Sequence, residues 1–434
     1  MPISQTGARM DTEADDYLNE WREVPLTSVA DIRFSSVNKV SQPGEEPVRL
    51  CNYTDVYKND YVTADMDFMR ATATKSEIER FGLQVGDVII TKDSETPDDI
   101  GIPTVVDTTA PDLVCGYHLA LLRPNQDEVD PTFLAKQLAH HRIARYFGQQ
   151  ANGTTRYGLS TAAISNAPLH LPRPESQRSA SALMRMVDAQ ISQTETVIAK
   201  LKQVRAGMLH DLLSYGLDEH GQLRDPIAHP EQFKDSPLGL IPRAWDVGTV
   251  KSLAINRDSK RIPVKQADRE SRHGLYPYYG ASGIIDYIDG FIFEGDFVLI
   301  GEDGENLRSR QLPLAFIATG KFWVNNHAHI LEPLPETDVR FLATILENQD
   351  FIPWLLGSAQ PKLTQRNLEI VPLRIPLPDE QKRISDSLEK CDIEINAEII
   401  ELEKLKSLKS GLQDDLLIGR VRVPETIMEG AENA

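Results

Sequence analysis

One stretch decides the fold, and it occurs twice. Residues 171–213 read LPRPESQRSASALMRMVDAQISQTETVIAKLKQVRAGMLHDLL, and residues 375–417 read IPLPDEQKRISDSLEKCDIEINAEIIELEKLKSLKSGLQDDLL. The two stretches align without a gap at an offset of 204 residues (375 − 171). Identical pairs include Pro172/Pro376, Pro174/Pro378, Gln177/Gln381, Lys200/Lys404, Leu201/Leu405, Lys202/Lys406 and Gly207/Gly411. Self-similarity at a fixed offset indicates a duplicated unit, so the chain is interpreted as two copies of one unit.

The repeat continues upstream at shifted offsets. Gly86-Asp87-Val88-Ile89-Ile90 matches Gly295-Asp296-Phe297-Val298-Leu299 at an offset of 209 (295 − 86), and Trp21 matches Trp245 at 224 (245 − 21). An offset that falls in steps is what insertions in the loops of a shared scaffold would produce. Each copy is therefore predicted to hold a variable domain followed by a long helix.

Each repeated stretch is expected to form one amphipathic helix. It opens with Pro-x-Pro-acid-x-Gln, and both proline and acidic residues suit the first turn of a helix. Apolar residues then recur at alternating spacings of three and four, which is typical of a coiled-coil seam. The predicted seam residues are Val187, Ile191, Ile198, Leu201, Met208, Leu212, Ile395, Leu402, Leu405, Leu412 and Leu416. Polar residues interrupt the seam at Thr194, Arg205, Glu398 and Lys409.

The shared register favours packing of the two helices against each other, although each could instead pack on its own domain. At 1.5 Å per residue, each helix is roughly 60 Å long. An antiparallel pair would hold the variable domains at opposite ends. It would thereby fix the separation of the two domains along a DNA duplex, if the chain binds one.

The variable domains contain short β-type runs such as GDVIIT (86–91), LVCGYHLALL (113–122) and FVLIGED (297–303), punctuated by Gly, Pro and Asn. The predicted fold class is α+β: two mixed α/β domains in a pseudo-twofold arrangement, joined by two long antiparallel helices that form a coiled coil. The predicted order is an acidic N-terminal tail (1–16), a first variable domain (17–172), a central long helix (173–215), a linker (216–244), a second variable domain (245–374), a distal long helix (375–417) and a C-terminal tail (418–434).

Loop chemistry differs between the two copies although the scaffold matches, as expected where loops read different base edges. Asn, Arg, Lys, Ser and Thr are residue types that pair with base edges or phosphates. The candidate DNA contacts are Lys92, Ser94, Asn152, Thr154, Thr155, Arg156 and Tyr157 in the first copy, and Tyr278, Tyr279, Ser282, Asn306, Lys321, Asn325, Asn326 and Lys362 in the second. Alternatively, the aromatic residues among them belong to the core, and the Asn residues form turns.

The net charge of −19 argues by itself against a nucleic-acid binder, because phosphate contacts need Lys and Arg. Two segments depart from this mean. Residues 136–160 contain four Lys/Arg and no acid, and residues 251–272 contain seven Lys/Arg against three acids. Each segment is either a local DNA-binding patch or an ordinary solvated face.

No catalytic, metal or membrane motif stands out. The three cysteines lack zinc or disulfide spacing, and the N-terminus lacks the apolar segment of a signal peptide, so a cytoplasmic location is expected. The chain has neither an Asn/Asp-Pro-Pro-aromatic motif for amino methylation nor a phosphate-binding Gly-x-x-x-x-Gly-Lys-Ser/Thr motif. Glu302, Asp303 and Glu305 are interpreted as an acidic turn, and His118 and His327 as structural histidines.

The chain resembles the specificity subunits of type I restriction–modification enzymes in several blocks. These are the doubled LPxPxxQ helix, the block IPRAW…YPYYGASGIIDYIDGFIFEGDFVLIGEDGENL…AFIATGKFWVNNHAHIL, the segments NGTTRYGLS and KLTQRNL before the helices, and VRLCNYTDVYKNDY with GDVIITKDSETPDDIGIP. The resemblance extends from Tyr17 to Val423.

This resemblance implies two target-recognition domains, each reading one half of a bipartite, asymmetric duplex DNA target. It implies as partners two methyltransferase subunits, which use S-adenosylmethionine, and two restriction subunits, which use ATP and Mg. The helices would dock the methyltransferase subunits, and the chain itself would be non-catalytic and bind no cofactor. The alternatives are a specificity subunit of a modification-only or type II system and, in a different class, a coiled-coil scaffold without a DNA role.

Overall fold

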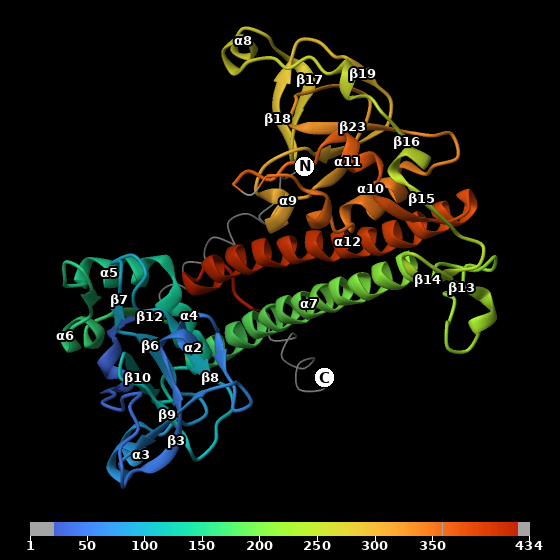
Figure 1. Cartoon of the computed structure of the whole chain (residues 1–434). Helices are drawn as coiled ribbons and strands as arrows, with labels where there is room; N and C mark the ends of the chain where they lie inside the picture. Colours follow the sequence, from blue (N-terminus) through green and yellow to red (C-terminus); the bar gives the residue numbers. More distant parts are fainter. Residues whose placement is uncertain (1–20, 358, 424–434) are drawn as a thin grey trace, which may run out of the picture. The chain divides into compact units, whose positions relative to one another are not determined.

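The computed structural model describes residues 21–357 and 359–423 (Figure 1). The predicted N-terminal tail and the end of the predicted C-terminal tail therefore lie outside the described residues. The chain divides into two compact units, which are named here unit 1 (Met1–Glu195 and Ile400–Ala434) and unit 2 (Thr196–Ile399). Each unit contains one α/β domain together with one part of each long helix.

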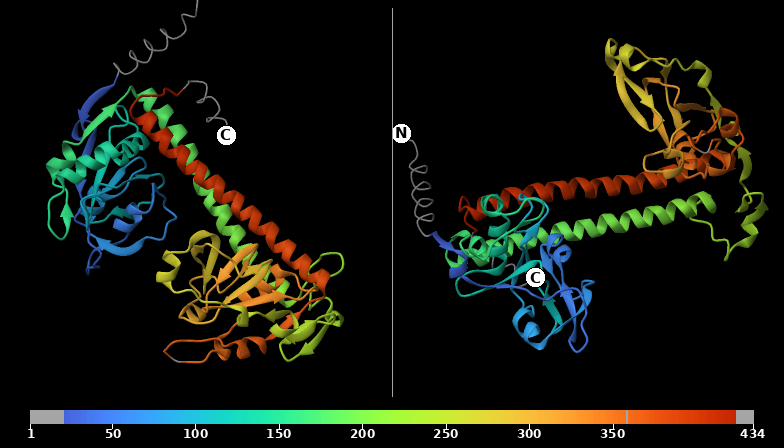
Figure 2. Two further views of the ribbon diagram at one scale, coloured as in Figure 1. Left: turned by 90° about the horizontal axis from the view of Figure 1, so that it is seen from above. Right: turned by 60° about the vertical axis from the view of Figure 1, so that its left-hand side comes forward.

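The two long helices are α7 (Pro174–Ser214) and α12 (Pro378–Leu417). Within each unit their segments lie side by side (Figures 1 and 2). In unit 1, Asp188 and Glu195 of α7 form ion pairs with Lys409 and Lys406 of α12. In unit 2, Arg205 pairs with Asp392, and Leu212 shares a core with Leu388. Residue numbers that rise along α7 meet numbers that fall along α12, so the paired segments are antiparallel in both units.

The predicted seam residues line these contacts. Six are buried, namely Val187, Ile191, Ile198, Leu212, Ile395 and Leu416. The other five are half-buried, namely Leu201, Met208, Leu402, Leu405 and Leu412. The prediction that the two helices pack on each other is confirmed, as is the predicted fold class of mixed α/β domains carried by paired long helices.

Two of the polar residues that interrupt the seam belong to ion pairs between the helices. Lys409 contacts Asp188 in unit 1 (Nζ–Oδ1 2.8 Å), and Arg205 holds both carboxylate oxygens of Asp392 in unit 2. The offset of 204 relates the two acids (392 − 188) and the two bases (409 − 205). The same acid–base pair therefore occurs once in each unit, and a charge pair at a seam favours one register over its alternatives.

The α/β domain of unit 1 is built around a five-stranded sheet in the order β2-β10-β6-β8-β4. Its strands are β2 (Ala30–Phe34), β4 (Tyr61–Val62), β6 (Val88–Thr91), β8 (Pro103–Val106) and β10 (Leu119–Pro124). A second sheet has the order β5 (Met69–Ala73), β3 (Glu46–Cys51) and β9 (Leu113–Cys115). The strand pairs are β1 (Arg22–Pro25) with β12 (Pro168–Leu171) and β7 (Asp93–Ser94) with β11 (Tyr157–Gly158). The helices are η1 (Leu26–Ser28), α2 (Tyr53–Tyr57), α3 (Lys75–Phe81), α4 (Pro131–Ala139), α5 (His141–Gln150) and α6 (Thr161–Ser165).

The α/β domain of unit 2 contains two four-stranded sheets. One has the order β16 (Ala254–Asn256), β23 (Ala328–Pro333), β20 (Phe297–Gly301) and β21 (Ala315–Ala318). The other has the order β18 (Gly283–Ile288), β17 (His273–Gly280), β22 (Lys321–Val324) and β19 (Phe293–Glu294). The strand pairs are β15 (Asp246–Thr249) with β24 (Pro372–Ile375) and β13 (Phe233–Ser236) with β14 (Gly239–Pro242). The helices are η2 (Pro230–Gln232), η3 (Val250–Ser252), η4 (Asp258–Lys260), α8 (Gln266–Glu270), α9 (Asn306–Ser309), α10 (Val339–Glu347), η5 (Ile352–Trp354) and α11 (Gln365–Glu369).

The two domains share one scaffold. The strand order β2-β10-β6-β8 in unit 1 is repeated as β16-β23-β20-β21 in unit 2, and β1–β12 is repeated as β15–β24. The second sheets differ, because unit 1 has three strands there and unit 2 has four. This agrees with the sequence repeat. Within each matching block the spacing of residues is the same in both copies, whereas the offset between the copies changes from block to block.

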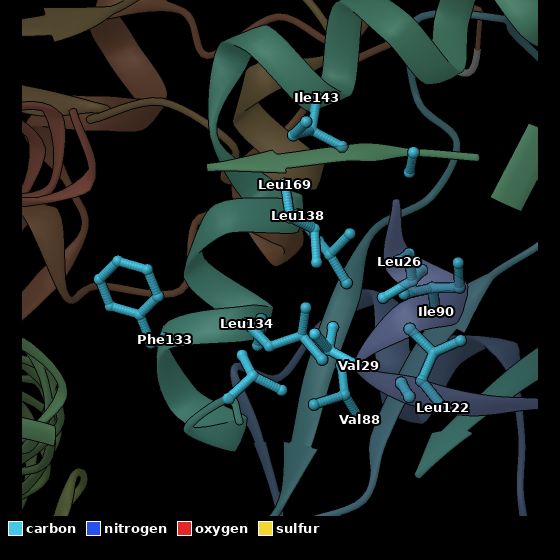
Figure 3. Packing of buried hydrophobic residues seen from close by; sticks show 14 of the residues in the cluster. Leu26, Val29, Val88, Ile90, Leu122, Phe133, Leu134, Leu138, Ile143 and Leu169 are labelled. Carbon is cyan, nitrogen blue, oxygen red and sulfur yellow. The ribbon is translucent and has the colours of Figure 1, made fainter. Parts of the chain in front are cut away.

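Strand periodicity explains why the central strands are mostly apolar, as in the run Val88–Ile90 of β6. In β6, Val88 and Ile90 face the core that Leu134 and Leu138 of α4 complete (Figure 3), whereas Ile89 faces the core beneath the second sheet. Successive side chains of a strand point to opposite faces, so a strand covered on both faces has no polar position.

A side-chain knot ties each long helix to its own domain. In unit 1, Gln177 accepts from the backbone N–H of Asp130 (3.0 Å) and donates to the carbonyl oxygen of Pro172 (2.9 Å), while Ser181 donates to the Asp130 carboxylate. Asp130 is the N-cap of α4. This set of contacts joins the first turns of α7 to the start of α4.

Unit 2 repeats the knot at the start of α12. Gln381 accepts from the N–H of Asp338 (3.1 Å) and donates to the carbonyl oxygen of Pro376 (3.0 Å), while Ser385 donates to the Asp338 carboxylate (3.0 Å). Asp338 is the N-cap of α10, and Gln381 is buried. The glutamine of the Pro-x-Pro-acid-x-Gln signature thus has a structural role in both copies.

The predicted linker at 216–244 is not an extended connection, because it contains the β13–β14 hairpin. It is anchored by Glu380 of α12, whose carboxylate accepts from Arg224 (2.6 Å) and from the N–H of Leu217 (2.9 Å). In the part of the chain that the structure describes, no helix is both long and apolar enough to cross a membrane.

We expect Gln177→Ala to lower the free energy of unfolding by about 1–3 kcal/mol, because it strands a buried N–H and a buried carbonyl. Urea unfolding followed by circular dichroism measures the change. The matched control is Gln203→Ala on the exposed face of α7, which should alter stability by less than about 0.5 kcal/mol. Equal effects of the two substitutions would show that the knot carries no special stability.

Candidate nucleic-acid interface

Each unit presents one short β-hairpin loop ahead of the helix that precedes its last strand. In unit 1, reciprocal backbone hydrogen bonds between Asn152 and Gly158 (3.0 and 2.9 Å) close the loop. In unit 2, the equivalent bonds join Leu356 and Lys362 (both 2.8 Å). The offset of 204 relates both ends of the two loops (356 − 152 and 362 − 158). These two loops are named here the unit 1 hairpin (152–158) and the unit 2 hairpin (356–362); Ser358 of the latter lies outside the described residues.

Both hairpins depend on a glycine at their second position. Gly153 has φ +147°, and a Cβ there would lie 2.0 Å from the carbonyl oxygen of Arg156. Gly357 has φ +82°, and a Cβ there would lie 2.5 Å from the carbonyl oxygen of Gln360. A left-handed backbone with no space for a side chain admits only glycine. The glycine allows each loop to fold back on itself and project the side chains at positions 156 and 360.

Each hairpin is anchored to the loop that follows the central strand. Leu159 donates its N–H to the carbonyl of Lys92 (2.9 Å), and Leu363 donates to the carbonyl of Glu302 (2.8 Å). Tyr157–Gly158 also pairs with Asp93–Ser94 as β11 and β7, and Lys362 forms a bridge to Asp303. The segments 91–95 and 301–306, which continue from β6 and β20, are therefore brought next to the hairpins within their own units.

A histidine–carboxylate pair lies at the same place in each unit. His118 Nδ1 contacts Asp93 Oδ2 at 2.7 Å, and His327 Nδ1 contacts Asp303 Oδ1 at 2.9 Å. Both imidazoles are accessible, with 40% and 51% of their side chains exposed. The interpretation of these histidines as purely structural is incomplete, because they border the hairpins. Their shared offset of 209 was the only sequence signal that they are equivalent.

Unit 1 has an open cleft beside its hairpin, with a volume of about 1050 Å³. Three predicted residues line it: Ser94, Thr155 and Arg156. Sequence analysis missed Tyr53 and Tyr57, whose rings stack at 5.5 Å between centroids on the cleft wall. It also missed the acidic lining, which consists of Asp93, Glu95 and Asp99.

The other candidates of unit 1 lie around this cleft or serve the loop itself. Lys92 lies over the rings of Tyr117 (4.7 Å) and Phe34 (5.8 Å), and Thr154 is exposed at the hairpin tip. Asn152 donates to the carbonyl of Gln150 (2.9 Å), which is a turn contact. Tyr157 is half-buried against the main core of the unit.

The candidates of unit 2 include two that are buried. Tyr278 is fully buried, and its hydroxyl accepts from the N–H of Val264 (3.1 Å), so it is a core residue and we withdraw it as a DNA contact. Asn325 is buried and accepts from the N–H of His327 (2.8 Å), which makes it a turn residue. The burial of Tyr278 cannot be predicted from the run Tyr-Pro-Tyr-Tyr-Gly, because its first, third and fourth residues are all tyrosine.

Most of the remaining unit 2 candidates make contacts of their own. Asn306 holds its loop through the N–H and carbonyl of Leu312 (2.9 and 3.0 Å) and lies 3.4 Å from Ser282 Oγ. Tyr279 packs on Phe316 and Phe322. Lys321 lies over the Phe291 ring (4.6 Å) and 3.8 Å from Glu294, and Lys362 pairs with Glu302 (2.9 Å). Asn326 is exposed.

The two basic segments, 136–160 and 251–272, have fewer unpaired cations than their sequences suggest. In 251–272, five of the seven cations form ion pairs: Lys251, Arg257, Arg261, Arg269 and Arg272. In 136–160, Lys136 is buried against Asp60 and Asp188. Local sequence counts missed these partners because the acids lie far away along the chain. The patches therefore offer fewer free phosphate contacts than their composition suggests.

A buried polar network supports the unit 2 hairpin. Asp258, Glu302 and His329 lie close enough together to hold a metal ion. Arg261 and Lys362 already occupy the Glu302 carboxylate, while the His329 ring contacts Asp258 and the carbonyl of Leu363. The donor set is satisfied without a cation, and its role is to hold the hairpin strand at Leu363.

The comparisons with known proteins agree on one family. Residues 242–404 match the family model described as the type I restriction modification DNA specificity domain. A type I restriction enzyme specificity subunit from Haemophilus influenzae is 43% identical over 120 residues, which cover 27% of this chain and 30% of that relative. The MjaX specificity subunit of Methanocaldococcus jannaschii is 23% identical over 371 residues, which cover 80% of this chain and 81% of the relative.

Solved structures share the fold. The S subunit of a type I restriction–modification system from M. genitalium superposes with a TM-score of 0.57 at 15% identity, over 91% of this chain and 96% of that chain. A chain from a structural study of type I complex assembly and conformational transition gives 0.51 at 16% identity, over 92% and 97%. Residues 242–404 therefore match a type I restriction modification DNA specificity domain, and the chain as a whole shares the fold of these solved specificity subunits.

The buried network predicts a pH dependence. Burial would raise the pKa of Asp258, but the hydrogen bond and charge of His329, with the charge of Arg261, outweigh it and lower that pKa. A carboxyl with a lowered folded-state pKa contributes stability above its unfolded value of about 4, and the contribution disappears as pH falls through the folded value. We expect the difference in unfolding free energy between the wild type and Asp258→Asn to shrink as pH falls from 5 towards 3.

Urea unfolding at four pH values measures this difference. Asp268→Asn on the exposed surface of α8 is the matched control and should give no pH-dependent difference. A difference that stays constant down to pH 3 would contradict the assignment.

Proposed function

We propose that the chain is the non-catalytic sequence-recognition subunit of a type I restriction–modification complex, and that each unit reads one half of a bipartite duplex DNA target. The observation that carries the proposal is the repetition of one scaffold, β2-β10-β6-β8 and β16-β23-β20-β21, with an equivalent exposed hairpin on each copy. Two different loop sets on one scaffold are suited to two different half-sites.

The proposed partners follow from the family. Two methyltransferase subunits would dock on the long helices and modify adenine with S-adenosylmethionine, and two restriction subunits would act with ATP and Mg in the cytoplasm. Exposed apolar residues outside the seam support docking on the helices, among them Val204, Ile393, Ile400 and Leu408. The match to this family leaves the modification-only and type II alternatives open, and a restriction-subunit gene beside this one would favour the full type I system.

The decisive experiment is to express the chain with its methyltransferase partner and map methylated adenines across the host genome. A bipartite motif with two unlike half-sites separated by a fixed spacer is expected. Methylation without sequence preference would favour the scaffold alternative, in which the chain has no DNA role.

The continuous helices predict that spacer length follows helix length. We expect four residues inserted after Glu195 in α7, together with four after Ile399 in α12, to lengthen the spacer by about two base pairs, because four residues rise about 6 Å and a base pair about 3.4 Å. Both insertions fall at the division between the units, so the ion pair of each unit is retained. Methylome mapping of the variant reads the spacer directly.

The control is a four-residue insertion after Gly221, a turn glycine with φ +77° and open space around it. It should leave the motif unchanged. Altered half-sites with an unchanged spacer in the helix variant would reject helix length as the determinant.

The charge balance predicts that the chain binds DNA weakly alone. With a net charge of −19 and most cations of 251–272 paired, the chain has few free phosphate contacts. We expect the affinity for the mapped target, measured by mobility shift, to rise on the order of tenfold or more when the methyltransferase subunit is added. Strong sequence-specific binding by the chain alone would contradict this expectation.

A further inference from the structure

Residues 156 and 360 occupy equivalent positions in the two hairpins. The offset of 204 relates Arg156 to Gln360 (360 − 156), just as it relates the closing residues and the glycines. Both side chains are exposed, and both backbone carbonyls are turned inwards against a glycine. The loops therefore present one arginine and one glutamine from the same place on the same scaffold.

We infer that positions 156 and 360 are the corresponding base-reading positions of the two units, with Arg156 contacting a guanine in one half-site and Gln360 contacting an adenine in the other. The inference rests on the proposed function and deepens it. Arginine matches the O6 and N7 acceptors of guanine, and glutamine matches the N6 donor and N7 acceptor of adenine.

The guanidinium of Arg156 is available for a ligand. It forms no ion pair with any residue that the structure describes, and its Nη2 lies 3.3 Å from His118 Nδ1. That nitrogen lies closer to the Asp93 carboxylate, at 2.7 Å. A nitrogen that donates to a carboxylate cannot also accept from a guanidinium, so the donors of Arg156 stay uncommitted while the His118–Asp93 pair positions it.

The surroundings of Arg156 favour a base edge over a phosphate. The carboxylates of Asp93, Glu95 and Asp99 outnumber the one lysine, Lys39, in the lining of the cleft that Arg156 borders, and a surplus of negative charge disfavours phosphate groups. Carboxylates accept hydrogen bonds from exocyclic amino groups of bases. An arginine at an acidic cleft is therefore placed for base readout, whereas phosphate contact would require a basic surface.

Gln360 is the counterpart with free hydrogen-bonding groups in unit 2. Within the described part of the chain, no side-chain hydrogen bond engages its amide, whereas Lys362 beside it is paired with Glu302. Ala359 has no polar side-chain group, and Pro361 is buried. An exposed amide can donate and accept at the same time, which is what the N6 donor and N7 acceptor of adenine require.

The test exchanges the two residues in the complex with the methyltransferase subunit. Methylome mapping of Arg156→Gln should show one guanine position, in one half-site, losing its preference by roughly tenfold to hundredfold, with adenine as the favoured replacement. Gln360→Arg should convert one adenine position, in the other half-site, to guanine. Each substitution should leave the opposite half-site and the spacer unchanged.

Two charge-matched controls separate base readout from general electrostatics. Arg145→Gln removes a cation from the exposed face of α5, and Gln232→Arg adds one in η2. Both should change the overall level of methylation at most, and not the motif. Circular dichroism and co-purification with the methyltransferase subunit show whether each variant is folded and assembled.

The outcomes distinguish this inference from the proposed function. A wild-type complex with no sequence preference would remove the proposed function and the inference with it. The wild-type complex could instead give a bipartite motif that both variants, Arg156→Gln and Gln360→Arg, retain unchanged although they assemble. That result would overturn the inference and leave the proposed function standing. A motif that shifts in the controls as much as in the hairpin variants would also overturn it.

Discussion

The structure depends on the attachment of each long helix to its own domain through a single buried glutamine. Gln177 and Gln381 each satisfy the N-terminus of a domain helix and the carbonyl of the proline five residues earlier. Because a buried amide must find partners for its donors and acceptors, the contact is directional in a way that apolar packing is not. It anchors the first turns of α7 to the first domain and those of α12 to the second.

Sequence pattern predicted the long helices, the seam and the shared scaffold because each of these is periodic. Helical spacing alone assigns Ile198 and Ile395 to the apolar faces of their helices, and both residues are buried. The second copy of the repeat shows the same spacing and so supports the same prediction. Residues 152–157 attracted notice because Asn, Thr and Arg pair with base edges or phosphates, but the hairpin that they form was not predicted.

Contacts between distant segments lay beyond that reasoning. Arg269 and Arg272 look like free cations in the sequence, but Asp286 and Asp289, 17 residues further on, neutralise them. Tyr278 stands in a run of tyrosines that the sequence does not distinguish, yet sheet pairing places this one in the core. Tyr53 and Tyr57 lie beside the same cleft as the hairpin only because the order of the strands brings these distant segments together. Each of these depends on which strands are neighbours, and that is determined by the whole domain.

The acid and base of each helix have a consequence for the direction of pairing. With Asp188 opposite Lys409 and Arg205 opposite Asp392, every charged seam contact is attractive in the antiparallel arrangement. If one helix were reversed so that the two ran parallel at the repeat offset, Asp188 would lie beside Asp392 and Arg205 beside Lys409. Both contacts would then be repulsive. The charges therefore encode polarity as well as register: the apolar seam makes the helices associate, and two ion pairs exclude the wrong orientation.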